Sequence, residues 1–185
     1  MVLSEILEVL QFVPLSIFWA PSQNSDMLWV IIPIYFSWTF AEFFQEKTGT
    51  SLGNAISNGV VGVWAGMDWL RTTNKAYDFT QLFKNAEFVA EMALSIGIIV
   101  YGIFIILAGV NTLEIAKYIG RIRQVTFVLV VFTPVIYNVL GISWYAIFSC
   151  LIYFPLFYYT VELLDKFVPN PKVLIKDIND IRSVG

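Results

Sequence analysis

Histidine is absent from this chain of 185 residues, and cysteine occurs once, at position 150. Without histidine, the chain lacks the imidazole ligands of most haem, copper, non-haem iron and zinc sites. It also lacks the general base of Ser-His-Asp and Cys-His nucleophiles. Cys150 has no partner for a disulfide and lies in an apolar run, so we expect a packing role for it. We therefore expect no metal, no cofactor and no enzymatic activity.

Motifs for nucleotides and nucleic acids are missing as well. The chain contains neither a P-loop nor a G-x-G-x-x-G pattern. Its 11 basic residues are outnumbered by 14 acidic residues, which gives a formal net charge of −3. We expect no nucleic-acid partner, because such partners require a basic surface. An intramembrane aspartyl enzyme would need two facing aspartates, and only Asp68 lies within a segment predicted below to span a membrane (52–70), near its end.

Charged residues are scarce and unevenly distributed. They make up 14% of the chain, against about a quarter in soluble domains. Four stretches contain none of them, and each is about 15 residues or longer. About 20 apolar residues in a helix cross the hydrocarbon core of a bilayer. The sequence therefore predicts an integral membrane protein surrounded by lipid, and these stretches are 27–41, 48–67, 92–113 and 125–161.

The longest of these stretches is expected to contain two helices, separated at Gly141-Ile142-Ser143. Glycine often ends a helix and serine often caps the next one. We therefore predict an all-α fold, a polytopic helical bundle with about five transmembrane helices and short interfacial amphipathic helices. The predicted spans are 27–45, 52–70, 93–111, 123–141 and 144–163.

The segments outside the bundle have their own patterns. Residues 1–26 predict an interfacial or half-membrane helix rather than a secretory signal, because Glu5 and Glu8 stand where a signal would be basic. Residues 27–165 form the predicted transmembrane domain. Residues 166–185 form a polar tail, and two interpretations of it remain open. Its apolar residues favour docking, either onto the inner loops or onto a cytoplasmic partner, and the alternative is a disordered end. Helical spacing predicts interfacial helices over 78–92 and 111–123.

The distribution of lysine and arginine predicts the orientation. Cytoplasmic loops are usually enriched in these residues. Five spans with an outside N-terminus and a cytoplasmic C-terminus place eight of the 11 basic residues inside. The three outside are Arg71, Lys75 and Lys84.

Residues 51–70 read "SLGNAISNGVVGVWAGMDWL" and contain an unusual number of small and polar residues. Small residues at three- and four-residue steps let membrane helices approach closely. A polar stripe beside them must face protein or water, because amides in lipid lose their hydrogen bonds. The predicted packing ridge is Ala55, Gly59, Gly62 and Gly66, and the polar stripe includes Asn54, Asn58 and Asp68.

A polar cluster is expected where the first span meets this helix. Glu42 and Glu46 end the first span, and Asn54 and Asn58 begin the next helix at the same depth, close to Lys47. Three interpretations remain open: a hydrogen bond that locks a hairpin, a cation or proton site, and a contact with another subunit. Near the other end, Asp68 is expected to pair with Arg71, three residues later.

Two functions are compatible with these patterns. The first is a non-enzymatic packing or assembly subunit of a larger membrane complex, with other membrane subunits as partners. The second is a small homo-oligomeric cation channel or transporter, in which several copies arrange the polar stripe around a pore and Asp68 forms a ring at its mouth.

Overall fold

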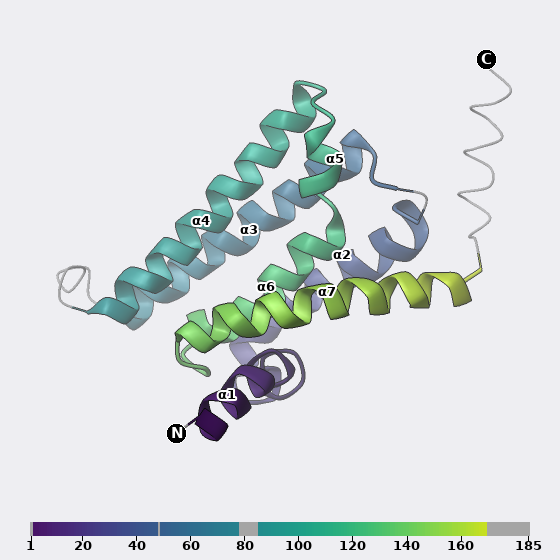
Figure 1. The fold of residues 1–185 in the computed structure, drawn as a ribbon. Coiled ribbons are helices and arrows are strands. Elements are labelled where there is room, and N and C mark those ends of the chain that lie inside the picture. The colour runs from purple at the N-terminus through teal and green to yellow at the C-terminus, as the bar shows by residue number, and fades with distance from the viewer. Residues whose placement is uncertain (1, 48, 78–84, 170–185) are drawn as a thin grey trace, which may run out of the picture.

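The computed structural model describes residues 2–47, 49–77 and 85–169, and helices are the only regular elements in these ranges (Figure 1). The all-α prediction is therefore confirmed. Short π- and 3₁₀-helical turns join or extend the helices at Leu15–Trp19 (η1), Ala20–Ser22 (η2), Ser25–Met27 (η3) and Ala41–Gln45 (η4). The α-helices are α1 (Val2–Pro14), α2 (Leu28–Phe40), α3 (Leu52–Ala76), α4 (Ala86–Val110), α5 (Ile115–Ile119), α6 (Ile122–Ile136) and α7 (Trp144–Phe167).

Among the described residues, three helical segments are long and apolar enough to cross a membrane: Ser25–Gln45, Ala86–Val110 and Trp144–Phe167. The structure thus supports a membrane helical bundle. Helix α6 is apolar but has 15 residues, about 22 Å of helix. Helix α3 has 25 residues, but its polar stripe lowers its hydropathy below that of a typical span.

Helices α3 and α4 lie side by side along most of their lengths (Figure 1). The small residues of α3 are buried at this contact. A Cβ atom added to Gly59 would lie 2.8 Å from the carbonyl oxygen of Gly102, and one added to Gly66 would lie 3.1 Å from that of Ser95. The two backbones therefore approach as closely as glycine permits.

Helix α6 forms the centre of the bundle. Twelve of its 15 residues are buried, and α2, α3 and η1 pack around it. Leu129 and Ile136 are fully buried on this helix, as is the charged residue Arg123. Other parts of the chain therefore surround α6 on nearly every side and shield most of its residues from solvent or lipid.

The end of α6 differs from the prediction that the helix continues to Gly141. The helix ends at Ile136, and Asn138 adopts a left-handed conformation with φ 55°. The N–H of Val139 donates to the carbonyl of Pro134 at 2.9 Å, and that of Asn138 donates to Val135 at 3.0 Å. These two bonds form a Schellman motif, in which asparagine can replace the usual glycine. Ser143 does precede α7, but its side chain caps nothing.

The start of α4 also differs from the prediction. The helix begins at Ala86 rather than at residue 93, because the side-chain oxygen of Asn85 accepts the N–H of Glu87 at 2.9 Å. Residues 86–92, expected in a separate interfacial helix, belong to α4, and residues 78–84 lie outside the described ranges. The predicted helix over 111–123 is reduced to α5, since Asn111 ends α4 instead of capping a new helix.

The N-terminal helix packs against α7 (Figure 1). Pro14 has no N–H, so the carbonyl of Leu10 lacks its usual helical donor. The hydroxyl of Tyr153 in α7 donates to that carbonyl at 2.7 Å. The N–H of Val13 donates to Ser149 Oγ at 3.3 Å. Polar side chains of α7 thus pair with backbone groups of α1, including the carbonyl that Pro14 leaves without a donor.

Candidate functional site

The widened turn η4 brings two acidic residues into the interior. The N–H of Glu46 donates to the carbonyl of Ala41 at 2.7 Å, five residues earlier, as in a π-helix. The side chains of Glu42 and Glu46 are both fully buried. A buried carboxylate requires hydrogen bonds or a cation. The two residues meet this requirement in different ways.

Glu46 is held by neutral donors. Asn58 Nδ2 donates to Glu46 Oε1 at 2.6 Å, and Thr50 Oγ1 donates to Glu46 Oε2 at 2.7 Å. The N–H of Ile122, the first residue of α6, donates to the same Oε2 at 3.2 Å. A carboxylate at this position also interacts favourably with the positive end of a helix. Glu46 therefore links η4, α3 and the start of α6.

Gly120 allows this link to form. Asn58 Nδ2 also donates to the carbonyl of Gly120, at 2.8 Å. A Cβ atom at Gly120 would lie 2.7 Å from the carbonyl oxygen of Ala116 and 2.9 Å from the Cβ of Ala55. Any larger residue would push the turn before α6 away from α3, and Asn58 would lose this acceptor.

Glu42 is held by a cation. Arg123 Nε donates to Glu42 Oε1 at 2.6 Å, across the bundle from η4 to α6. The two terminal nitrogens of the same guanidinium donate to Glu162 Oε2 and Asp165 Oδ2, each at 2.6 Å, on the last turns of α7. Arg123 thus bonds to three carboxylates from two other parts of the chain. We call these four residues the Arg123 centre.

The Arg123 centre is deeply buried on one side and open on the other. The side chains of Arg123 and Glu42 are 0% exposed and that of Asp165 is 9% exposed, but that of Glu162 is 50% exposed. The Arg123 guanidinium also lies 5.0 Å from the ring centre of Tyr158. Arg121 Nη1 donates to the hydroxyl of Tyr158 at 2.9 Å. A second cation therefore lies beside the three carboxylates.

Several polar atoms around this centre have no hydrogen-bond partner among the described residues. They are Glu42 Oε2, Asp165 Oδ1, Arg121 Nε and Trp38 Nε1. A buried polar atom without a partner costs about 1–3 kcal/mol. The centre therefore combines strong ion pairs with polar atoms that lower its net contribution to stability.

The other end of α3 carries a separate polar pair. Asp68 forms the predicted ion pair with Arg71, and it also accepts the hydroxyl of Tyr137 at 2.6 Å. Asp68 is ten positions after Asn58 in α3, which corresponds to about 15 Å along the helix axis. The polar stripe is thus divided into two sites, one at each end of α3.

The remaining predicted site residues lie at the edge of the first of these sites. Asn54 is half-buried in the first turn of α3, where its N–H donates to Ser51 Oγ at 3.1 Å. Lys47 Nζ donates to the carbonyl of Val168 instead of contacting the acidic residues. Within the described part of the chain, no group of acidic, cysteine or histidine residues is arranged to hold a metal ion.

The sequence reasoning did not identify Arg123, Glu162 or Asp165. The sequence places Arg123 at the cytoplasmic end of the predicted span 123–141, among the basic residues that set the orientation. Its spacing carries a signal, however: Thr126, Phe127 and Val130 follow at three, four and seven residues, and all are buried. Arg123 therefore lies on the buried face of α6. The three-residue spacing of Glu162 and Asp165 likewise places both carboxylates on one face of α7.

Comparisons with protein-family models, with curated proteins and with solved structures found no match to this chain.

Proposed function

We propose that this chain is a non-enzymatic integral membrane protein that acts as a packing and assembly subunit of a larger membrane complex. The observation that carries the proposal is the uncovered surface of α7. Only Ala146, Ser149, Val161 and Asp165 of its 24 residues are buried. The exposed residues include large aromatic and aliphatic side chains along the whole helix, such as Trp144, Phe148, Leu151, Leu156 and Tyr159.

The hydrogen bonds of α3 favour this function over a homo-oligomeric cation channel. A channel would expose the polar stripe to water around a shared axis. Asn58 instead bonds to Glu46 and to the Gly120 carbonyl, and Asp68 bonds to Arg71 and Tyr137. These groups are used within one copy of the chain, so the stripe supports internal packing.

Five membrane crossings, with the N-terminus outside and the C-terminus cytoplasmic, are part of the proposal. Helix α3 accompanies the apolar helix α4 along most of its length, so a crossing by α4 carries α3 across as well. Helix α6 is enclosed by the crossing helices and is the shortest of the five. The tail beyond residue 169 lies outside the described residues, and a cytoplasmic partner for it remains a proposal.

The assembly function is tested by native mass spectrometry after mild extraction at the natural expression level. We expect stoichiometric foreign chains to accompany the wild-type protein. Leu151→Trp on α7 should remove them, because a close protein contact does not accommodate added bulk, whereas lipid does. Val100→Trp, on the exposed face of α4, is the matched control. Recovery of this chain alone, or only with copies of itself, would refute the proposal.

A further inference from the structure

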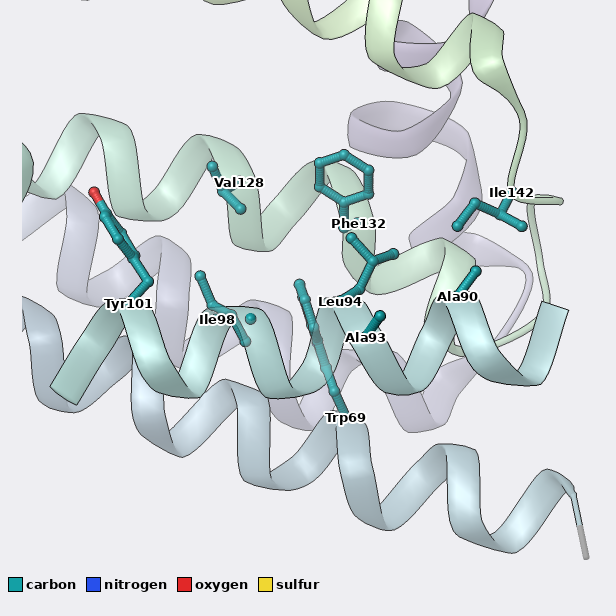
Figure 2. Close-up of a pocket in the computed structure, with 10 residues that line it drawn as sticks. Trp69, Ala90, Ala93, Leu94, Ile98, Tyr101, Val128, Phe132 and Ile142 are labelled. Atoms are coloured by element: carbon teal, nitrogen blue, oxygen red, sulfur yellow. The ribbon is translucent and has the colours of Figure 1, made fainter. Parts of the chain in front are cut away.

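An apolar groove lies between α4 and α6, and Trp69 of α3 contributes to its lining. Both helices pack on α3, and a space of about 580 Å³ remains between them. Figure 2 shows Val128 and Phe132 of α6 opposite Leu94 and Ile98 of α4, with Trp69 of α3 in the same pocket. The volume falls within the range of about 300–1,000 Å³ that is usual for ligand sites.

The groove has the depth of one leaflet of a bilayer. Its lining on α4 extends from Ala90 to Tyr101, a distance of about 16 Å along the helix. Half of a hydrocarbon core of about 30 Å has nearly the same thickness. At the deep end, the hydroxyl of Tyr101 donates a hydrogen bond to the carbonyl of Ile119. A single hydrocarbon chain in the groove would therefore reach the middle of the membrane.

The shallow end of the groove leads to an acidic mouth. A smaller pocket of about 60 Å³ shares Ile142 with the groove and is lined by Glu87, Glu91 and Asn138. In residues 2–47, 49–77 and 85–169, no lysine or arginine forms a salt bridge with either glutamate. The groups at this mouth are thus mainly hydrogen-bond acceptors.

Tyr77 fixes the geometry of the mouth. Its hydroxyl lies 3.3 Å from Glu91 Oε1 and 3.2 Å from Asn138 Oδ1, and Thr73 Oγ1 lies 3.4 Å from Glu91 Oε2. Burial, together with the nearby charges of Glu91 and Glu87, raises the pKa of Tyr77, so this hydroxyl remains protonated at neutral pH. Glu87 is exposed, and its carboxylate is accessible to a ligand.

We propose that this groove and its mouth bind a single-chain amphiphile with a cationic amine headgroup. The hydrocarbon chain lies between α4 and α6, and the ammonium group donates hydrogen bonds to Glu87 and Asn138. Charge complementarity selects the amine over an acid, because a carboxylate headgroup would be placed beside the exposed carboxylate of Glu87. The basic residues Arg71 and Lys75 line a different pocket, which shares Asn138 with the mouth.

The test uses the full chain in nanodiscs of zwitterionic phospholipid. The probes are an octadecylamine and an octadecanoic acid, each with a photoreactive diazirine near the end of the chain. After illumination, mass spectrometry of peptides locates the labelled residues. We expect saturable labelling at one site per chain, within 94–101 and 128–132, and at least tenfold more labelling by the amine.

Variants separate the groove from general contact with lipid. A Cβ atom at Gly97 would meet no atom within 4 Å, so Gly97→Phe fills the groove without displacing the backbone. It should reduce labelling at least tenfold, whereas Ile96→Phe, on the outward face of α4, should leave it unchanged. Ala93→Phe fills the same groove and replaces Gly97→Phe if that variant does not fold.

A second pair of variants tests the headgroup. Glu87→Gln should abolish the preference for the amine, and Glu8→Gln, in an exposed position on α1, should retain it. Equal labelling by amine and acid in the wild-type protein would overturn the proposal. So would unsaturable labelling spread over the outer faces of α4 and α7, or labelling that persists when the groove is filled.

Discussion

At the scale of single residues, Arg123 has the most demanding environment, since its guanidinium is fully buried and contacts three carboxylates. Removing one member of a buried ion pair is strongly destabilising, because the remaining charge stays in a medium that solvates it poorly. Ion pairs at the surface contribute little, because water and salt screen them. Arg123 is the buried case in this chain, and the more exposed pair Glu114–Lys117 is the surface case.

The first prediction concerns Arg123→Met. The variant leaves Glu42 buried without its ion-pair partner and should lose about 3–5 kcal/mol of stability, measured by unfolding in detergent. Lys117→Met is the control and should lose about 0–1 kcal/mol. Adding Glu42→Gln to Arg123→Met removes the uncompensated charge and should recover part of the loss. A loss no larger than that of the control would contradict this account of the Arg123 centre.

The second prediction concerns Asn58→Leu. The change removes the donor to both Glu46 and the Gly120 carbonyl, and buried groups without partners should lower stability by about 1–3 kcal/mol. Unfolding measurements and ion flux through reconstituted vesicles distinguish the two functions. A change in flux with unaltered stability would support a channel instead of a packing element.

At the scale of elements, the contact between α3 and α4 depends on glycine at defined positions. Gly102 and Gly97 both lie within α4, and glycine is about 1 kcal/mol less favourable than alanine inside a helix. Their surroundings differ, however. A Cβ atom at Gly102 would lie 2.6 Å from the carbonyl oxygen of Gly59, whereas one at Gly97 would meet open space.

The third prediction compares these two glycines. Gly97→Ala should stabilise the protein by up to about 1 kcal/mol, because it gains helix propensity without a clash. Gly102→Ala should destabilise it by about 1–3 kcal/mol, because backbone atoms must shift. Thermal unfolding of both variants in the same detergent gives the comparison. Similar effects of the two changes would show that close packing of α3 and α4 is not required.

The elements also show what the sequence allows one to predict. Charge-free runs indicated the apolar helices, and the spacing of Gly59, Gly62 and Gly66 indicated the packing face, because both patterns are local. The predicted end of α6 was wrong because the chain turns at Asn138, and the turn was expected at Gly141. The partner of Glu42 was missed because Arg123 is 81 positions away in the sequence, and only the folded bundle brings them together.

At the scale of the whole molecule, the number of crossings determines which loops share a side of the membrane. With five crossings, residue 22 lies outside and residue 113 inside. If only the three most apolar segments crossed, two crossings would lie between residues 22 and 113. Both residues would then be on the same side of the membrane. Helix α3 therefore decides the topology.

The fourth prediction tests this topology with Ser22→Cys and Leu113→Cys in a Cys150→Ser background. In intact cells, a membrane-impermeant maleimide should label position 22 and should label position 113 only after the membrane is opened. Gly141→Cys is expected to behave like position 22. Labelling of positions 22 and 113 from the same side would exclude five crossings.

The position of α7 in the chain has a consequence for synthesis. Helix α7 is the last of the described helices to be synthesised. Tyr153 and Ser149 of this helix form hydrogen bonds with the backbone of α1, and Glu162 and Asp165 bind Arg123. Until α7 emerges, the nascent protein contains a guanidinium with only Glu42 as its counter-ion and an N-terminal helix without its partner. Quality-control proteases recognise such unfinished intermediates. A chain that stops at residue 143 should therefore disappear faster in a pulse–chase experiment than the full-length protein.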